Sequence, residues 1–260
     1  MTAQTYADPR AAVRPVPRRY HRPVRWAVRR DLGAAVAALA VLLALVRPGP
    51  LGWAAGAVYA VAAWWVLAGA FRFRALGPAD RVTLGRVVLA GGVTALVADG
   101  PGTAGWALAA VASAALVLDG VDGWVARRTG TATELGARFD MEVDAFLILV
   151  LSVEVAVSDG AWVLAIGAMR YVFGAAAWAL PWLRRALPAS VARKAVAVVQ
   201  GMALTAAALL PHPFAIAVAA AALAALAWSF GRDVRWLAGR RERRTADAAR
   251  SPRLLDPVAR

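Results

Sequence analysis

Four aspartates between residues 119 and 144 have the spacing that says most about chemistry in this chain. Their segment reads DGVDGWVARRTGTATELGARFDMEVD and lies between two long apolar runs. Asp119 and Asp122 are three residues apart and Asp140 and Asp144 are four apart, so on helices the members of each pair share one face. Two such pairs facing each other would give the oxygen ligands that Mg²⁺ prefers beside substrate phosphates. We therefore expect Mg²⁺ at this site, with Mn²⁺ as the alternative.

Helix capping and zinc binding account less well for these carboxylates. Capping at a membrane interface uses one or two acidic residues per helix start, whereas this segment holds six of the sixteen acidic residues in the chain. Zinc is not expected, because the chain has no cysteine and only two histidines.

The segment meets every position of the pattern D-x2-D-G-x2-A-R-x8-G-x3-D-x3-D. The eight fixed residues are Asp119, Asp122, Gly123, Ala126, Arg127, Gly136, Asp140 and Asp144. The chain therefore resembles the CDP-alcohol phosphotransferase family. The resemblance implies transfer of a phosphatidyl group from CDP-diacylglycerol to the hydroxyl of a small polar alcohol, with release of CMP. It also implies a homodimer.

The resemblance assigns roles within the motif. Asp119, Asp122 and Asp140 would hold the metal ions against the pyrophosphate, and Asp144 would be either the general base or a fourth ligand. Arg127 would pair with the pyrophosphate, since a guanidinium fork suits phosphate oxygens.

Small residues beside the aspartates would let the nucleotide approach the helices. Gly123, Ala126 and Gly136 each leave one helix face thin, although close helix packing explains a single glycine equally well. Upstream, PADRVTLGR at 78–86 resembles the family's P-N-x-x-T-x-x-R entry segment. Thr83 is therefore a candidate cytidine contact, as is Asp80, which stands where asparagine is usual. An ordinary capped helix start is the alternative for this segment.

The acceptor pocket is expected from later basic residues: Arg170, Arg193 and Lys194. An arginine inside an apolar run is costly and suggests function. These segments loosely resemble phosphatidylglycerophosphate synthases, which implies a phosphorylated acceptor, glycerol 3-phosphate first and inositol phosphate second. Control of membrane topology is the alternative role for Arg193 and Lys194.

The rest of the chain predicts an all-α polytopic membrane helix bundle. Hydrophobic residues make up 61% and the mean hydropathy is +0.58. Apolar segments lie at about 32–46, 51–70, 82–98, 103–118, 139–157, 161–180, 195–210 and 213–230. We divide the chain into a basic cytoplasmic tail (1–30), about two extra membrane helices (31–77), a six-helix family core (78–231) and a second basic cytoplasmic tail (232–260).

Charge distribution predicts orientation. The net charge is +14, with eight arginines in residues 1–30 and nine in 231–260, and the remaining basic residues favour the loops on the same side. We therefore expect an integral protein of a bacterial plasma membrane with the aspartates facing the cytoplasm. The partner of the basic tails is expected to be anionic membrane lipid and not nucleic acid, because no base-stacking or groove-reading pattern is present.

Two rival enzyme or carrier classes and a non-enzymatic role are weighed against this prediction. An ion transporter would place carboxylates near mid-membrane on several helices, and prenyl transfer would need two aspartate-rich loops. An inactive scaffold would not need all eight motif positions. Neither an ion transporter nor a prenyl transferase explains Gly123, Ala126 and Arg127 together.

Overall fold

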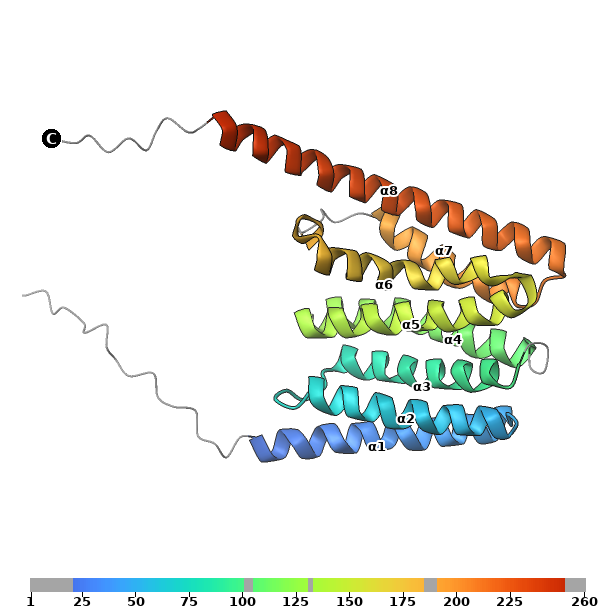
Figure 1. Ribbon diagram of the computed structural model, residues 1–260. Coiled ribbons are helices and arrows are strands. Elements are labelled where there is room, and N and C mark those ends of the chain that lie inside the picture. Colours follow the sequence, from blue (N-terminus) through green and yellow to red (C-terminus); the bar gives the residue numbers. More distant parts are fainter. Residues whose placement is uncertain (1–20, 101–104, 131–132, 185–190, 251–260) are drawn as a thin grey trace, which may run out of the picture.

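The computed structural model describes residues 21–100, 105–130, 133–184 and 191–250. Within these ranges the regular structure is entirely helical (Figure 1). The helices are α1 (His21–Val46), α2 (Pro50–Ala70), α3 (Pro78–Ala98), α4 (Gly105–Thr129), α5 (Glu134–Asp159), η2 (Ala161–Val163), α6 (Leu164–Ala179), η3 (Pro181–Arg184), α7 (Val191–Ala207) and α8 (His212–Arg250). The predicted all-α polytopic bundle is confirmed.

Each predicted apolar segment corresponds to one of the α-helices. Among the described residues, five segments are long and apolar enough to cross a membrane: Pro50–Ala70, Pro78–Ala98, Gly105–Thr129, Ala161–Ala179 and His212–Arg240. α5 is not among them, because it carries the acidic residues of the motif. α1 begins at His21 and α8 continues to Arg250, so both helices extend past the predicted membrane segments into the basic regions.

α3 lies at the centre of the bundle. It packs against α1, α2, α4 and α5. In its most apolar stretch, 61% of α3 is buried inside the bundle, compared with 17% of α2. Small residues make this burial feasible, because side chains of neighbouring helices fill the space above them. A Cβ on Gly91 would lie 2.6 Å from the Tyr59 ring, and a Cβ on Gly92 would lie 2.6 Å from Leu42.

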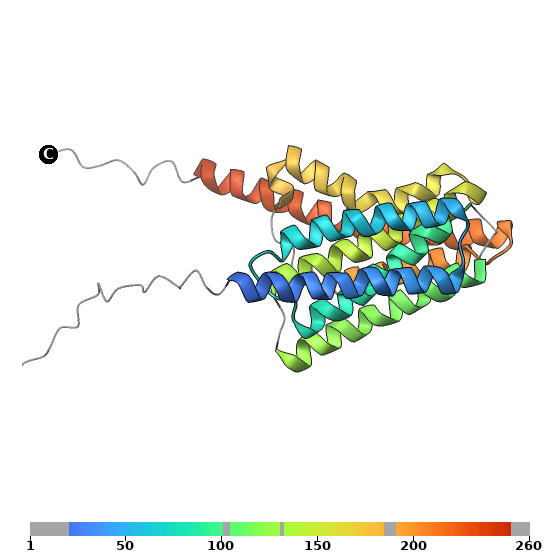
Figure 2. The ribbon, with the colours of Figure 1, turned by 90° about the horizontal axis from the view of Figure 1, so that it is seen from below.

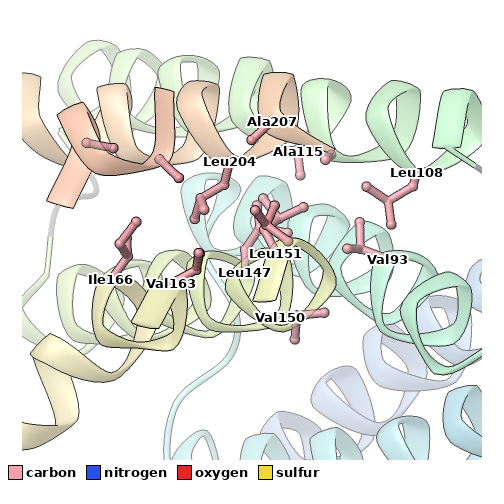
Figure 3. Close-up of a cluster of buried hydrophobic side chains, with 14 of the residues drawn as sticks. Val93, Leu108, Ala115, Leu147, Val150, Leu151, Val163, Ile166, Leu204 and Ala207 are labelled. Atoms are coloured by element: carbon pink, nitrogen blue, oxygen red, sulfur yellow. The ribbon is translucent and has the colours of Figure 1, made fainter. Parts of the chain in front are cut away.

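The largest apolar core joins α3 to the later helices. Figure 3 shows Val93 of α3, Leu108 of α4, Leu151 of α5 and Leu204 of α7 converging in it. Leu151 and Leu204 are fully buried. This core fixes the spacing of α3, α4, α5 and α7, which is the framework for the motif.

Polar contacts attach α2 to α3. The Asp99 carboxylate, just after α3, accepts hydrogen bonds from the backbone N–H groups of Gly49 (2.6 Å) and Gly52 (2.7 Å) at the start of α2. The Tyr59 hydroxyl donates to the Val87 carbonyl at 2.8 Å. The side chain that caps α2 is therefore that of Asp99, the residue after α3.

Successive α-helices run in opposite directions along a shared axis (Figures 1 and 2). The α2–α3 connection, the end of α4 and the start of α5 lie at the same end of the bundle (Figure 1). These segments carry four arginines: Arg72, Arg74, Arg127 and Arg138. The α1–α2 connection at the opposite end has only Arg47, so the end that carries the start of α5 is the more basic one.

Candidate functional site

Two helices carry the motif aspartates. Asp119 and Asp122 lie near the end of α4, and Asp140 and Asp144 lie near the start of α5. α5 begins there because Thr133 caps it, accepting a hydrogen bond from the Gly136 backbone N–H at 3.1 Å. α3 and α7 each pack against both α4 and α5. The motif therefore acquires its geometry from helices on either side of it.

Three of the four aspartates form a compact group. Asp119, Asp140 and Asp144 each offer a carboxylate oxygen, and these three oxygens lie within 4.8 Å of one another. All three side chains are partly buried. An all-oxygen set at this spacing suits Mg²⁺ or Mn²⁺, so the donor chemistry fits the cation predicted from the sequence.

Asp122 is placed differently from the other three. It is buried, with 4% of its surface exposed. Its Oδ2 lies 3.2 Å from the Thr83 hydroxyl and 3.0 Å from Nη1 of Arg86. Below we call the four side chains Asp119, Asp122, Asp140 and Asp144 the aspartate cluster.

The guanidinium of Arg86 occupies the middle of the aspartate cluster. Nη1 lies 2.9 Å from Asp119 and 3.0 Å from Asp122, and it also contacts Asp140. Nη2 contacts Asp144. Arg86 is completely buried. Sequence reasoning matched Arg86 to the entry segment and counted it among the basic residues of the inside loops, and that placement is wrong, because Arg86 is buried within α3. An arginine inside an apolar helix is the same signal that singled out Arg170.

Thr83 and Asp80 face neighbouring helices. Thr83 is 3% exposed, and its hydroxyl lies 3.2 Å from both Asp122 Oδ2 and the Ala79 carbonyl. Asp80 is equally buried, accepts from the Gly77 N–H at 2.7 Å and pairs with Arg74. Asp80 thus caps α3, as the alternative for the entry segment supposed.

At Gly136, α5 lies close to the start of α3. A Cβ there would lie 2.7 Å from Asp80 Oδ1 and 3.0 Å from Thr133 Oγ1. Arg74 donates to the Thr133 hydroxyl at 2.5 Å and also pairs with Asp80. The contacts around Gly136 are therefore those of helix packing.

Gly123, Ala126 and Arg127 lie on the last turns of α4. The Arg127 side chain folds back along the helix toward Gly123. A Cβ on Gly123 would lie 3.3 Å from its Nη1. Ala126 is partly buried, whereas Arg127 is exposed. The glycine thus leaves room for the guanidinium that the motif places one turn later.

The structure distributes the predicted acceptor residues over different contacts. Arg170 of α6 pairs with Glu142, which lies two residues before Asp144 on α5. Arg193 of α7 pairs with Asp233 of α8 at 3.3 Å. Lys194 lies on α7, and its side chain is outside the described part. Arg170 thus contacts α5, a helix of the aspartate cluster.

One comparison with known proteins finds a protein family. The family model described as CDP-alcohol phosphatidyltransferase matches residues 76–231. This range contains α3 to α7, the aspartate cluster and Arg86, and it leaves α1 and α2 outside. No curated protein and no solved structure matches the chain significantly.

Proposed function

The chain belongs to the CDP-alcohol phosphatidyltransferase family, which transfers a phosphatidyl group from a CDP-alcohol to an alcohol, and on this premise we propose a specific reaction. The donor is CDP-diacylglycerol and the first acceptor is glycerol 3-phosphate. The products are a phospholipid and CMP. The reaction belongs to phospholipid biosynthesis.

The observation that carries the proposal is the convergence of carboxylates from α4 and α5. Oxygens of Asp119, Asp140 and Asp144 lie within 4.8 Å of one another at one end of the bundle. Phosphoryl-type transfer needs charge neutralisation and alignment more than covalent help from the protein. The oxygen ligands of this cluster and the exposed Arg127, on the same helix as Asp119 and Asp122, supply groups for both.

In the proposed step the acceptor hydroxyl attacks the phosphorus that bears the diacylglycerol. The new bond joins the acceptor oxygen to that phosphorus, and the bond from the phosphorus to the bridging oxygen of the pyrophosphate breaks. CMP leaves with the bridging oxygen, and Asp144 takes the proton of the hydroxyl. Asp144 suits this role because it lies one turn along α5 from Asp140 and is partly exposed.

The remaining motif residues bind and orient the donor. Asp119, Asp122 and Asp140 would hold a divalent cation, which when bound neutralises charge on the pyrophosphate. Arg127 pairs with pyrophosphate oxygens. Gly123, Ala126, Gly136 and Thr83 are proposed to shape the nucleotide side of the site.

The acceptor is proposed to bind on the α6 side of the cluster. Arg170 is about one-third exposed at its side chain and already reaches α5 through Glu142. A guanidinium there favours a phosphorylated alcohol over a neutral one. Inositol phosphate is the second candidate, with Arg193 and Lys194 as further contacts.

We also propose that the site faces the cytoplasm of a bacterial plasma membrane. The end of the bundle that carries the aspartate cluster is the basic end, and basic loops stay on the cytoplasmic side. Nucleotide donors are found on that side. Anionic lipid and a second copy of the chain are the proposed partners, the latter tested by the mass of the purified complex in detergent.

The direct test is CMP release from CDP-diacylglycerol by the purified chain with Mg²⁺. The reactions contain glycerol 3-phosphate, inositol phosphate, inositol, serine or no acceptor. We expect release with glycerol 3-phosphate that stops on addition of EDTA. Release with another acceptor would correct the substrate, and release with none of them would favour an inactive scaffold.

A variant separates the two roles of Asp144. D144N should lower CMP release by roughly 10²-fold or more, because the base is lost, while Mg²⁺ still raises the unfolding temperature through the other aspartates. The control is E134Q, which changes an exposed acid on the same helix, 81% exposed and paired with Arg138. Loss of the Mg²⁺ stabilisation in D144N would make Asp144 a ligand instead.

A further inference from the structure

Arg86 is a buried charged group to which sequence reasoning assigned no chemical role. We propose that its guanidinium is an internal counter-cation that competes with the divalent ion for the aspartate cluster. The inference rests on the metal site of the proposed function and adds a residue that tunes it. Arg86 is thus a positioning residue, since it acts on the carboxylates that hold the ion.

The competition follows from the carboxylates that the two cations would share. The oxygens of Asp119, Asp140 and Asp144 that could hold an ion surround one small volume. Arg86 contacts a carboxylate oxygen of each of these three residues. An oxygen that coordinates Mg²⁺ lies about 2.0–2.1 Å from the ion. The guanidinium and the ion therefore cannot both keep the full set of contacts.

Burial makes the exchange costly for the arginine. Its side chain is completely buried, and the charged partners that it has among the described residues are the four aspartates. Its Nε has no hydrogen-bond partner there. A buried charge that loses its partners is strongly destabilising, so each carboxylate contact taken by an ion raises the free energy of Arg86.

Charge repulsion acts in the same direction. Two cations that share carboxylate oxygens are close neighbours, and water screens them poorly at a fully buried group. Asp122 takes part in the effect, because Nη1 of Arg86 lies 3.0 Å from its Oδ2 and the proposed function also makes Asp122 a ligand of the ion.

The counter-cation also assembles the site when no ion is bound. Arg86 lies on α3, and its partners lie on α4 and α5. Without a cation the four carboxylates would repel one another across these helices. The guanidinium thus holds the empty cluster in a shape ready for the ion, at the cost of a weaker affinity for that ion.

The test measures metal binding instead of turnover. The unfolding temperature of the full-length chain in detergent is recorded in EDTA and over a Mg²⁺ titration, which gives an apparent Kd. The variants are R86Q and R86K, with R81Q as the matched control. Arg81 lies on the same helix and pairs with Asp31 at 3.2 Å, outside the cluster.

We expect R86Q to unfold at a lower temperature than the wild type in EDTA and to bind Mg²⁺ about tenfold more tightly. That factor corresponds to the loss of one charge-assisted contact. R81Q should keep the wild-type Kd. R86K should bind Mg²⁺ a few-fold more tightly than the wild type, because one ammonium reaches fewer of the oxygens. If R86Q does not fold, R86K decides alone.

The outcomes separate the two proposals. If R86Q binds Mg²⁺ no more tightly than the wild type, the competition is overturned while the metal site stands. The same result in R86K overturns it where R86Q does not fold. Absence of any Mg²⁺ effect in the wild type and in both variants would overturn the metal site and the competition together. Tighter Mg²⁺ binding in the Arg86 variants, with an unchanged Kd in R81Q, would support the metal site and the competition.

Discussion

Replacing Gly136 with alanine should push α5 away from α3 and weaken the site. A Cβ at this position would lie 2.7 Å from Asp80 Oδ1 and 3.0 Å from Thr133 Oγ1. Asp80 cannot easily turn aside, because it is 3% exposed, accepts from the Gly77 N–H at 2.7 Å and pairs with Arg74. The strain must therefore be relieved by movement of α5 or by loss of these contacts.

The expected magnitude has two opposing parts. Overpacking of this kind costs about 1–3 kcal/mol. Alanine favours the helix over glycine by up to about 1 kcal/mol. The net loss of unfolding free energy should be about 1–2 kcal/mol. Because Asp140 follows Gly136 by one turn, CMP release should also fall, by about tenfold or more, since small displacements of reacting groups are costly.

The assay compares G136A with G174A. Gly174 lies on α6, and a Cβ there meets nothing within 4 Å, so G174A should be neutral or slightly stabilising. Thermal unfolding in detergent and CMP release are measured for both variants. If G136A unfolds at the same temperature as G174A and retains full turnover, the inferred close approach of α5 to α3 is wrong.

Three further predictions test the framework around the site. D99A should lower the free energy of unfolding by about 1–2 kcal/mol, because two backbone N–H groups at the start of α2 lose their acceptor. D99N should be less destabilising, since one carbonyl oxygen remains as an acceptor. Equal destabilisation of the two variants in thermal unfolding would argue against this cap. G167A should be more destabilising than G136A in the same measurement, because its Cβ would lie 2.5 Å from the backbone Cα of Leu149 and backbone cannot turn aside. R170Q should raise KM for a phosphorylated acceptor and leave KM for CDP-diacylglycerol near the wild-type value, and a change in the donor constant alone would move Arg170 out of the acceptor pocket.

Local pattern was enough for the fold class and for placing the four motif aspartates on two helices. Helix length and apolar content are properties of short segments, so eight apolar segments predicted eight helices. The spacing of Asp119, Asp122, Asp140 and Asp144 likewise predicted two carboxylate pairs on two helices. The eight-position motif then predicted the family, which the match over residues 76–231 confirms.

The ends of the helices were less well predicted. α8 continues to Arg250, although hydropathy falls well before that residue. Arginine has a good helix propensity, so a basic segment can prolong a helix after its apolar part ends. Hydropathy marks where a helix meets the membrane and not where the helix stops.

Only the tertiary structure decided how the aspartates are partnered. Arg86 is 33 to 58 residues from the carboxylates that surround it, and no periodicity in the sequence links positions that far apart. The packing of α3 against both α4 and α5 brings them together. The same packing turned Asp122 toward Thr83 and set Gly136 against Asp80. The sequence thus determined which groups the protein offers, and the helix packing determined which of them meet, because contacts between helices depend on which faces are buried together.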